Sequence, residues 1–156
     1  MRKSLFTIAI TFLLSFVSVS AETLKPTSWS SYGVSFLAPA DIIVDDDSEE
    51  GYTISNSNIT INVQLLNGEG LKKTELKSSL QHISDEDNIT VQSDITEIDL
   101  THFYGAYLTG NCETDQCLYS YLTVKDNSCS FYISIIYKPS NADDAIKIIR
   151  SFKLDE

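Results

Sequence analysis

The sequence predicts a single α+β domain: a mostly antiparallel sheet of about six or seven strands with two main helices packed against it. Three observations predict this class. Short apolar or alternating runs of strand length recur along most of the chain. Only two segments have the 3.6-residue period of an amphipathic helix. These two segments follow groups of several strands, which favours antiparallel pairing over a parallel sheet with alternating helices.

The first 21 residues have the pattern of a secretory signal peptide. Two basic residues precede an apolar run over residues 5–19, and Ala21 ends a stretch of small residues of the kind that a signal peptidase recognises. The apolar run is short for a membrane span, and no Cys stands at the cleavage point to carry a lipid. We therefore expect residues 1–21 to be removed, Glu22 to begin the mature protein, and the protein to be periplasmic or secreted.

The mature segment, residues 22–156, has the length of one domain. The whole chain has 11 Lys and Arg residues against 22 Asp and Glu residues. The signal segment holds two of the basic residues and none of the acidic ones, which leaves nine against 22, a formal charge of −13. Such a surface repels nucleic acid and anionic lipid, so we expect neither a nucleic-acid partner nor a stable membrane span.

The first half of the mature chain predicts strands separated by charged or polar turns. Residues 22–31 are polar and predict a loose lead-in, and residues 32–37 alternate in polarity up to Pro39, as a strand would. Acidic residues dominate 45–51, which predicts a turn. Residues 52–55 and 59–66 then form a hairpin around an Asn-Ser-Asn turn.

The first helix is expected over residues 71–83, where Leu76, Leu80 and Ile83 lie on one face. An Asp-Glu-Asp run closes this helix. We expect the following strands at residues 89–92, 95–100, 103–109, 118–124 and 129–137.

The second helix is expected over residues 142–150. Ser140 or Asn141 can cap its N-terminus, and Asp143 and Lys147 form a favourable pair one turn apart. Acidic residues in the first turn and basic residues in the last turn also suit the helix dipole.

The cysteines are Cys112, Cys117 and Cys129. A tight turn at Asp126-Asn127 would place Cys129 on the apolar face of its hairpin and Cys117 on the opposite face, so a bridge between these two would have to cross the sheet. We therefore favour a Cys112–Cys117 disulfide across the 113–116 loop, with Cys129 a buried, unreactive thiol. Three free thiols, or a bridge between chains, are the alternatives.

An aromatic row occupies the second face of the same hairpin. The expected register places Tyr121 opposite Tyr132, with Tyr119 on the same side, and aligns Leu108 with Tyr121 if the two cysteines face each other. The row is either a surface that binds a ligand or protein, or the seat of the C-terminal helix. We favour helix packing, because both sheet faces are partly apolar and two helices are available to cover them.

No pattern of known catalytic chemistry occurs, so we assign no catalytic residue, cofactor or metal ligand. His82 and His102 are the only histidines, and nothing in the sequence brings them together. Several carboxylates in residues 45–50 could bind Ca²⁺, but they lack the alternating spacing of an EF-hand loop, which favours a solvated turn.

Two ends of the mature chain resemble the Mog1/PsbP-like group. The segment Tyr32–Pro39, YGVSFLAP, is similar to the opening strand of those domains, and Ala145–Lys153, AIKIIRSFK, is similar to their closing helix and the short Ser-Phe piece after it. The resemblance implies an antiparallel sheet between helices and a role as a non-catalytic accessory or binding module. No functional residue of that group matches here, so none is transferred.

The sequence thus predicts an exported acidic accessory protein that binds an envelope or extracellular protein, or a small ligand. The candidate binding residues are Tyr119, Tyr121, Tyr132, Glu113 and Asp115. A small secreted hydrolase with a dispersed active site is one alternative. The other is a secreted inhibitor that uses residues 113–116 as a recognition tip, stiffened by the disulfide and therefore losing less entropy on binding.

Overall fold

The computed structural model describes residues 21–67 and 69–156, so the expected signal peptide lies outside the described residues except for Ala21. The elements follow one another as β1 (Leu24–Trp29), β2 (Val34–Pro39), β3 (Ile43–Asp47), β4 (Gly51–Ser55), β5 (Ile59–Leu65), η1 (Lys73–Glu75), α1 (Leu76–Glu86), β6 (Thr96–Asp99), β7 (Phe103–Cys112), β8 (Asp115–Val124), β9 (Ser130–Tyr137), η2 (Pro139–Asn141), α2 (Ala142–Arg150) and β10 (Lys153–Leu154).

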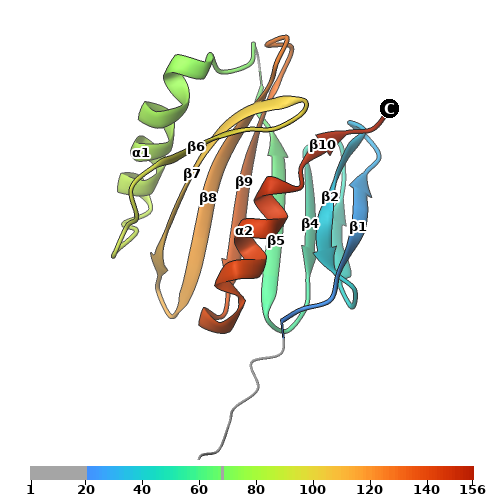
Figure 1. Cartoon of the computed structure of the whole chain (residues 1–156), viewed down its shortest axis with the longest axis vertical. Coiled ribbons are helices and arrows are strands. Elements are labelled where there is room, and N and C mark those ends of the chain that lie inside the picture. The colour runs from blue at the N-terminus through green and yellow to red at the C-terminus, as the bar shows by residue number, and fades with distance from the viewer. Residues whose placement is uncertain (1–20, 68) are drawn as a thin grey trace, which may run out of the picture.

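The strands form two antiparallel sheets, which confirms the predicted α+β class. The large sheet has seven strands in the order β3-β4-β5-β9-β8-β7-β6, and the small sheet has three in the order β1-β2-β10. Figure 1 shows α2 lying across the large sheet near β5 and β9, with β1 and β2 beside it and α1 at the other side of the molecule. Among the described residues no helix is long and apolar enough to cross a membrane.

Two apolar cores lie on opposite faces of the large sheet. One contains Leu118 and Leu122 of β8 together with Trp29, Phe36 and Ile149, so the small sheet and α2 cover this face. Alternate side chains of a strand point to opposite faces. Cys117, Tyr119 and Tyr121 of β8 therefore belong to the second core, which α1 covers.

The hairpin of β8 and β9 has the predicted register. Leu122 pairs with Phe131, Ser120 with Ile133, and Tyr121 with Tyr132. The turn is wider than the predicted two residues, because the Val124 N–H donates to the Cys129 carbonyl and the Asn127 N–H donates back to the Val124 carbonyl. The pairing is nevertheless as predicted, because the wider turn is still centred on Asp126 and Asn127.

Three strands were not predicted, and one predicted strand is absent. β1 occupies the expected lead-in, and β10 has two residues. β3 takes in residues 45–47, so the predicted 45–51 turn is confined to residues 48–50. Each of these strands is short or mostly exposed and therefore shows little apolar alternation in sequence. Residues 89–92, predicted to be a strand, make only the single bridge of Thr90 to Asn111. Positive φ angles at Asn88 and Val91 interrupt extended pairing there.

Both predicted helices are present. α2 has the predicted bounds, and Asn141 occupies its N-cap position without a side-chain capping bond. α1 starts later than predicted, because a 3₁₀ turn precedes it, and it extends through the acidic residues to Glu86. Gly70 allows the chain to approach the β8–β9 turn, since a Cβ there would lie 3.0 Å from the Asn127 carbonyl oxygen and 3.1 Å from the Cys129 carbonyl oxygen.

Candidate functional site: the disulfide hairpin and its hollow

The β7–β8 hairpin ends in a two-residue turn that is held by a disulfide. Glu113 has φ of +52°, which permits a tight turn through Thr114 and pairs Cys112 with Asp115. Cys112 and Cys117 are bonded, with their Cα atoms 5.9 Å apart, which agrees with the favoured pairing.

The two cysteines do not face each other, however. Cys117 pairs with Gly110, so the disulfide runs diagonally across the hairpin, and Leu108 pairs with Tyr119 where Tyr121 was expected. The predicted register was wrong by two residues because it assumed a four-residue loop. Since a shift of two residues preserves the face of every side chain, Leu108 still lies in the core with the tyrosines.

Gly110 lets the segment after α1 pack directly on this hairpin. A Cβ at Gly110 would lie 2.4 Å from Ile89 Cγ2 and 2.9 Å from the Thr90 carbonyl oxygen. Ile89 is buried, and the Asn111 and Thr90 backbones exchange hydrogen bonds of 2.8 and 3.1 Å. The end of α1 is therefore held beside the disulfide.

A hollow of about 390 Å³ lies where the hairpin tip meets the end of α1. We call it the hairpin hollow. Its lining residues come from the end of α1, from β7, β8 and β9, and from the β7–β8 turn, and they are Asp87, Cys112, Glu113, Thr114, Asp115, Tyr119 and Ile136. Three of the five predicted binding residues, Glu113, Asp115 and Tyr119, are thus brought together.

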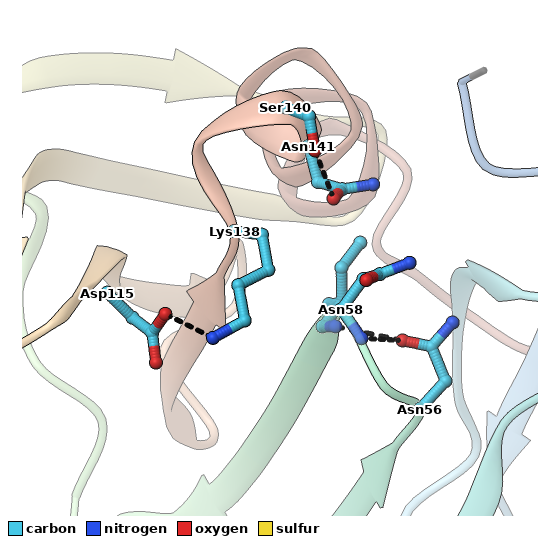
Figure 2. Close-up of polar contacts among 7 residues, drawn as sticks. Asn56, Asn58, Asp115, Lys138, Ser140 and Asn141 are labelled. Atoms are coloured by element: carbon cyan, nitrogen blue, oxygen red, sulfur yellow. Dashed lines mark hydrogen bonds and ion pairs between the residues drawn. The ribbon is translucent and has the colours of Figure 1, made fainter. Parts of the chain in front are cut away.

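Three carboxylates surround the hairpin hollow. Asp87 is the C-cap residue of α1, and Glu113 is exposed at the turn. Asp115 forms an ion pair of 2.6 Å with Lys138 Nζ, which reaches across from the end of β9 (Figure 2). The negative end of the α1 dipole adds to the negative potential on the Asp87 side.

Tyr119 forms the aromatic wall of the hairpin hollow and is 8% exposed. Its hydroxyl oxygen lies 3.7 Å from Cys112 Sγ. Burial, together with the nearby Asp87 carboxylate, raises the pKa of Tyr119 to about 12. The phenol is therefore neutral and able to donate a hydrogen bond throughout the physiological pH range.

Tyr121 and Tyr132 lie farther under helix α1. The Tyr132 ring centroid is 5.8 Å from that of Tyr119 and 5.4 Å from that of Tyr121, and burial raises the pKa of Tyr132. Helix packing over the tyrosine row was predicted and is found. The predicted helix was wrong: the cover is α1, with Leu76 and Leu80, because α2 lies on the opposite face.

The remaining sequence candidates lie away from the hairpin hollow. His82 is exposed and pairs with Glu86 at 3.3 Å, while His102 Nδ1 accepts the Leu154 N–H. Cys129 is a free thiol as predicted, but it is half-buried and not buried, and desolvation raises its pKa. Asp45 and its neighbours lie on edge strand β3, and the described residues contain no group of three or more His, Cys, Asp or Glu side chains arranged to hold a metal.

Apart from Thr114, which belongs to the predicted 113–116 tip, two residues of the hairpin hollow were not predicted. Asp87 is recognisable in the sequence as the last residue of the acidic run that closes the first helix. The neighbouring residues, however, do not indicate that this helix ends beside the disulfide. Ile136 belongs to β9 and reaches the hollow because β9 pairs with β8, with Ile136 opposite Cys117.

Solved structures share this fold over most of the chain. The Saccharomyces cerevisiae Ran-binding protein Mog1p matches with a TM-score of 0.60 and 15% identity, over 86% of this chain and 96% of that one. A structure of a point mutant of Mog1 matches with a TM-score of 0.59 and 15% identity, over 86% and 97% of the two chains. At this identity the likeness establishes the fold.

The comparison with curated proteins gave no match. A family profile described as "Dihydro-orotase-like" matches residues 17–141, which is most of the chain. This family falls within the Mog1/PsbP group, in agreement with the structural matches and with the resemblance at the two ends of the domain. The chain therefore belongs to the dihydro-orotase-like family and has the Mog1/PsbP fold.

Proposed function

We propose that this protein is an exported binding protein, acting in the periplasm or outside the cell, and that it binds a basic group of a partner protein in the hairpin hollow. The observation that carries the proposal is the arrangement of three carboxylates and a tyrosine ring at one rigid hairpin tip.

The charges of the hairpin hollow favour a cationic group. Within the described part of the chain, Asp115 is paired with Lys138, whereas Asp87 and Glu113 form no ion pair. A lysine or arginine entering the hollow would find two carboxylate acceptors and the neutral hydroxyl and ring of Tyr119. The same carboxylates would repel an anionic partner.

The hairpin tip is also ordered before any partner arrives. The diagonal disulfide joins the two strands next to the turn, and the Thr90–Asn111 bridge ties the tip to the segment after α1. A preordered surface loses less conformational entropy on binding than a flexible loop does. This supports the hairpin tip, rather than the exposed acidic turn after β3, as the recognition surface.

A protein partner is favoured over a small ligand by the shape of the site and by the fold. The hollow is open and lies at a hairpin turn, whereas small-molecule sites are usually enclosed and mostly apolar. Yeast Mog1p, described as Ran-binding, uses the same fold.

The test is a capture experiment with three proteins that begin at Glu22, using native envelope extract and culture fluid as sources of partners. The first is the unaltered chain, the second carries Asp87→Asn and Glu113→Gln, and the third is a control with Asp94→Asn and Glu156→Gln. The control removes the same charge at exposed positions outside the hollow.

We expect a stoichiometric partner that the unaltered and control chains retain equally and that the hollow variant binds at least about tenfold more weakly, as for a lost charged contact. Equal retention by all three chains would show that the hollow is not the site. Equal weakening of both variants would assign the effect to net charge.

A small secreted hydrolase is the second candidate, and the observation that favours it is the enzyme named in the family's description. Neither His82 nor His102 lines the hairpin hollow or either of two larger surface hollows of the described residues. Hydrolysis of dihydro-orotate by the purified chain, lost when the protein is unfolded, would replace the binding role.

A further inference from the structure

The backbone nitrogen of Glu22 lies against a buried carboxylate. It is 3.1 Å from Asp144 Oδ2, and the Asp144 side chain is only 2% exposed. Glu22 is the residue that the signal-peptide pattern places at the start of the mature protein. The site of predicted cleavage and a buried negative charge, 122 positions apart in sequence, therefore meet in the fold.

Among the described residues, Asp144 has one cationic partner, the exposed ammonium group of Lys147. Its Oδ1 lies 3.3 Å from Nζ of Lys147, a side chain that is 58% exposed, and its Oδ2 lies 3.4 Å from Asn141 Nδ2. Asp144 lies in the first turn of α2, where the helix dipole gives a positive potential. A buried carboxylate is stabilised much more by a close, ordered cation than by a solvated one.

The position of the Glu22 nitrogen is set by residues that follow it. The Thr23 carbonyl accepts the Ala40 N–H at 2.8 Å, next to the first pair of the β1–β2 ladder. The Glu22 carboxylate accepts a hydrogen bond of 2.7 Å from Asn58 Nδ2, on the turn between β4 and β5. None of these contacts involves residue 21, so removal of the preceding segment leaves the nitrogen in place.

We propose that cleavage between Ala21 and Glu22 creates an α-ammonium group that forms an ion pair with buried Asp144, so that processing itself stabilises the fold. A signal peptidase would supply the hydrolysis: water adds across the Ala21–Glu22 peptide bond, Ala21 leaves with a carboxylate, and the Glu22 amine takes up a proton. A single amide N–H donor next to Asp144 becomes a cation with three donors. This inference rests on the export included in the proposed function.

The position of the cleavage decides whether the pair forms. Ala21 lines an open hollow of about 410 Å³ together with Glu22, Thr23, Ala40, Asp41 and Asn58. A chain that begins one residue earlier would keep Glu22 as an amide and place its ammonium group at exposed Ala21. The two starting points therefore differ by one alanine but only one of them neutralises Asp144.

The test compares four chains released from an N-terminal fusion by a protease that leaves no extra residue. Two begin at Glu22 and at Ala21, and two carry Asp144→Asn in addition. We expect the Glu22 start to raise Tm by about 3–8 °C over the Ala21 start, and the difference to fall below about 1 °C with Asp144→Asn. Equal Tm values for the first two chains, or a difference that persists without Asp144, would overturn the proposal.

A second measurement needs no substitution. The rate at which an acylating reagent modifies the α-amino group near neutral pH reports how strongly the ammonium form is held. We expect Glu22 to react about tenfold more slowly than Ala21, as a tenfold difference in free amine corresponds to one pKa unit, with the lysine side chains as internal reference. Equal rates would contradict the ion pair.

The processing step is tested separately, by expressing the full chain in a bacterium and determining the N-terminus of the exported product by mass spectrometry. We expect Glu22, and any other N-terminus would overturn that step. None of these measurements involves a partner, so a failure of the hairpin hollow as a binding site would leave them interpretable.

Discussion

Thr123 Oγ1 and Ser130 Oγ lie 2.7 Å apart, fully buried, at the end of the β8–β9 hairpin. Leu71, which precedes η1 and α1, closes a ring with them: its N–H donates to Ser130 Oγ at 2.6 Å and its carbonyl accepts from Thr123 Oγ1 at 2.8 Å. Ser130 therefore donates to Thr123, and the ring fixes the entry of the chain into α1, whose far end borders the hairpin hollow.

Ser130→Ala should lower the free energy of unfolding by about 1–3 kcal/mol, because the Leu71 N–H loses its partner. Denaturant unfolding measures this change. Ser134→Ala on the same strand is the control, since Ser134 is half-buried and its hydroxyl makes no hydrogen bond among the described residues. Similar losses for both variants would contradict a specific role for the ring.

Lys138→Met should alter stability by less than about 1 kcal/mol, because the Lys138 side chain of its ion pair with Asp115 is 51% exposed to solvent. It should nevertheless increase the affinity of the hairpin hollow for a basic partner, since it frees the third carboxylate. Binding at low and high salt measures this, and the gain should shrink as salt screens the charge. Weaker binding would mean that Lys138 itself contacts the partner.

Replacing both cysteines of the disulfide by Ser should leave the fold intact and lower the free energy of unfolding by about 2 kcal/mol, the low end for disulfides, because the loop is short. Partner affinity should fall as well, since the hairpin tip is no longer preordered. Thermal unfolding and partner binding are the measurements, with Cys129→Ala as the control outside the hairpin. Unchanged affinity would remove the tip from the binding surface.

Gly110→Ala should cost about 1–3 kcal/mol of stability, because the new Cβ would displace Ile89 and the Thr90 backbone. Gly51→Ala is the matched control: it too lies in a strand, and its nearest atom would be 3.5 Å away, an ordinary contact. Equilibrium unfolding compares the two. A cost for Gly51→Ala as large as that for Gly110→Ala would show that the clash is not the cause.

The ionisation of Tyr119 predicts a stability loss at alkaline pH. Its pKa is about 12 in the folded protein, against about 10 for an unfolded tyrosine. Below pH 10 both states are neutral and the contribution is constant; between pH 10 and 12 only the unfolded state ionises, so stability falls. Tyr119→Phe should reduce the fall, as measured by denaturant unfolding across this range, and an unchanged slope would contradict the raised pKa.

Local sequence patterns predicted the parts of the fold that local interactions determine. The β8–β9 register followed from a polar turn between two apolar strands, and α2 followed from its apolar period and charge order. The edge strands β1 and β3 were missed because edge strands bury few side chains: every residue of β3 is exposed. Their pairing depends on neighbours that are distant in sequence.

The candidate site could be predicted in part for the same reason. The disulfide and the grouping of Glu113, Asp115 and Tyr119 follow from one hairpin. The contribution of Asp87 and the identity of the covering helix could not be predicted, because two amphipathic helices were available and either face of the sheet could receive either one. Only the path of the connecting segments decides which helix crosses to which face.

Because β9 lies between β5 and β8, the large sheet cannot be completed until late in the synthesis of the chain. β9 is the last strand of that sheet to be synthesised, yet it pairs with β5 on one side and β8 on the other. Before Ser130–Tyr137 emerges, β5 and β8 have no shared partner strand, so their inner edges would carry unpaired backbone groups, and such edges associate readily with other chains. The synthesis of β9 therefore joins two aggregation-prone fragments into one cooperative unit.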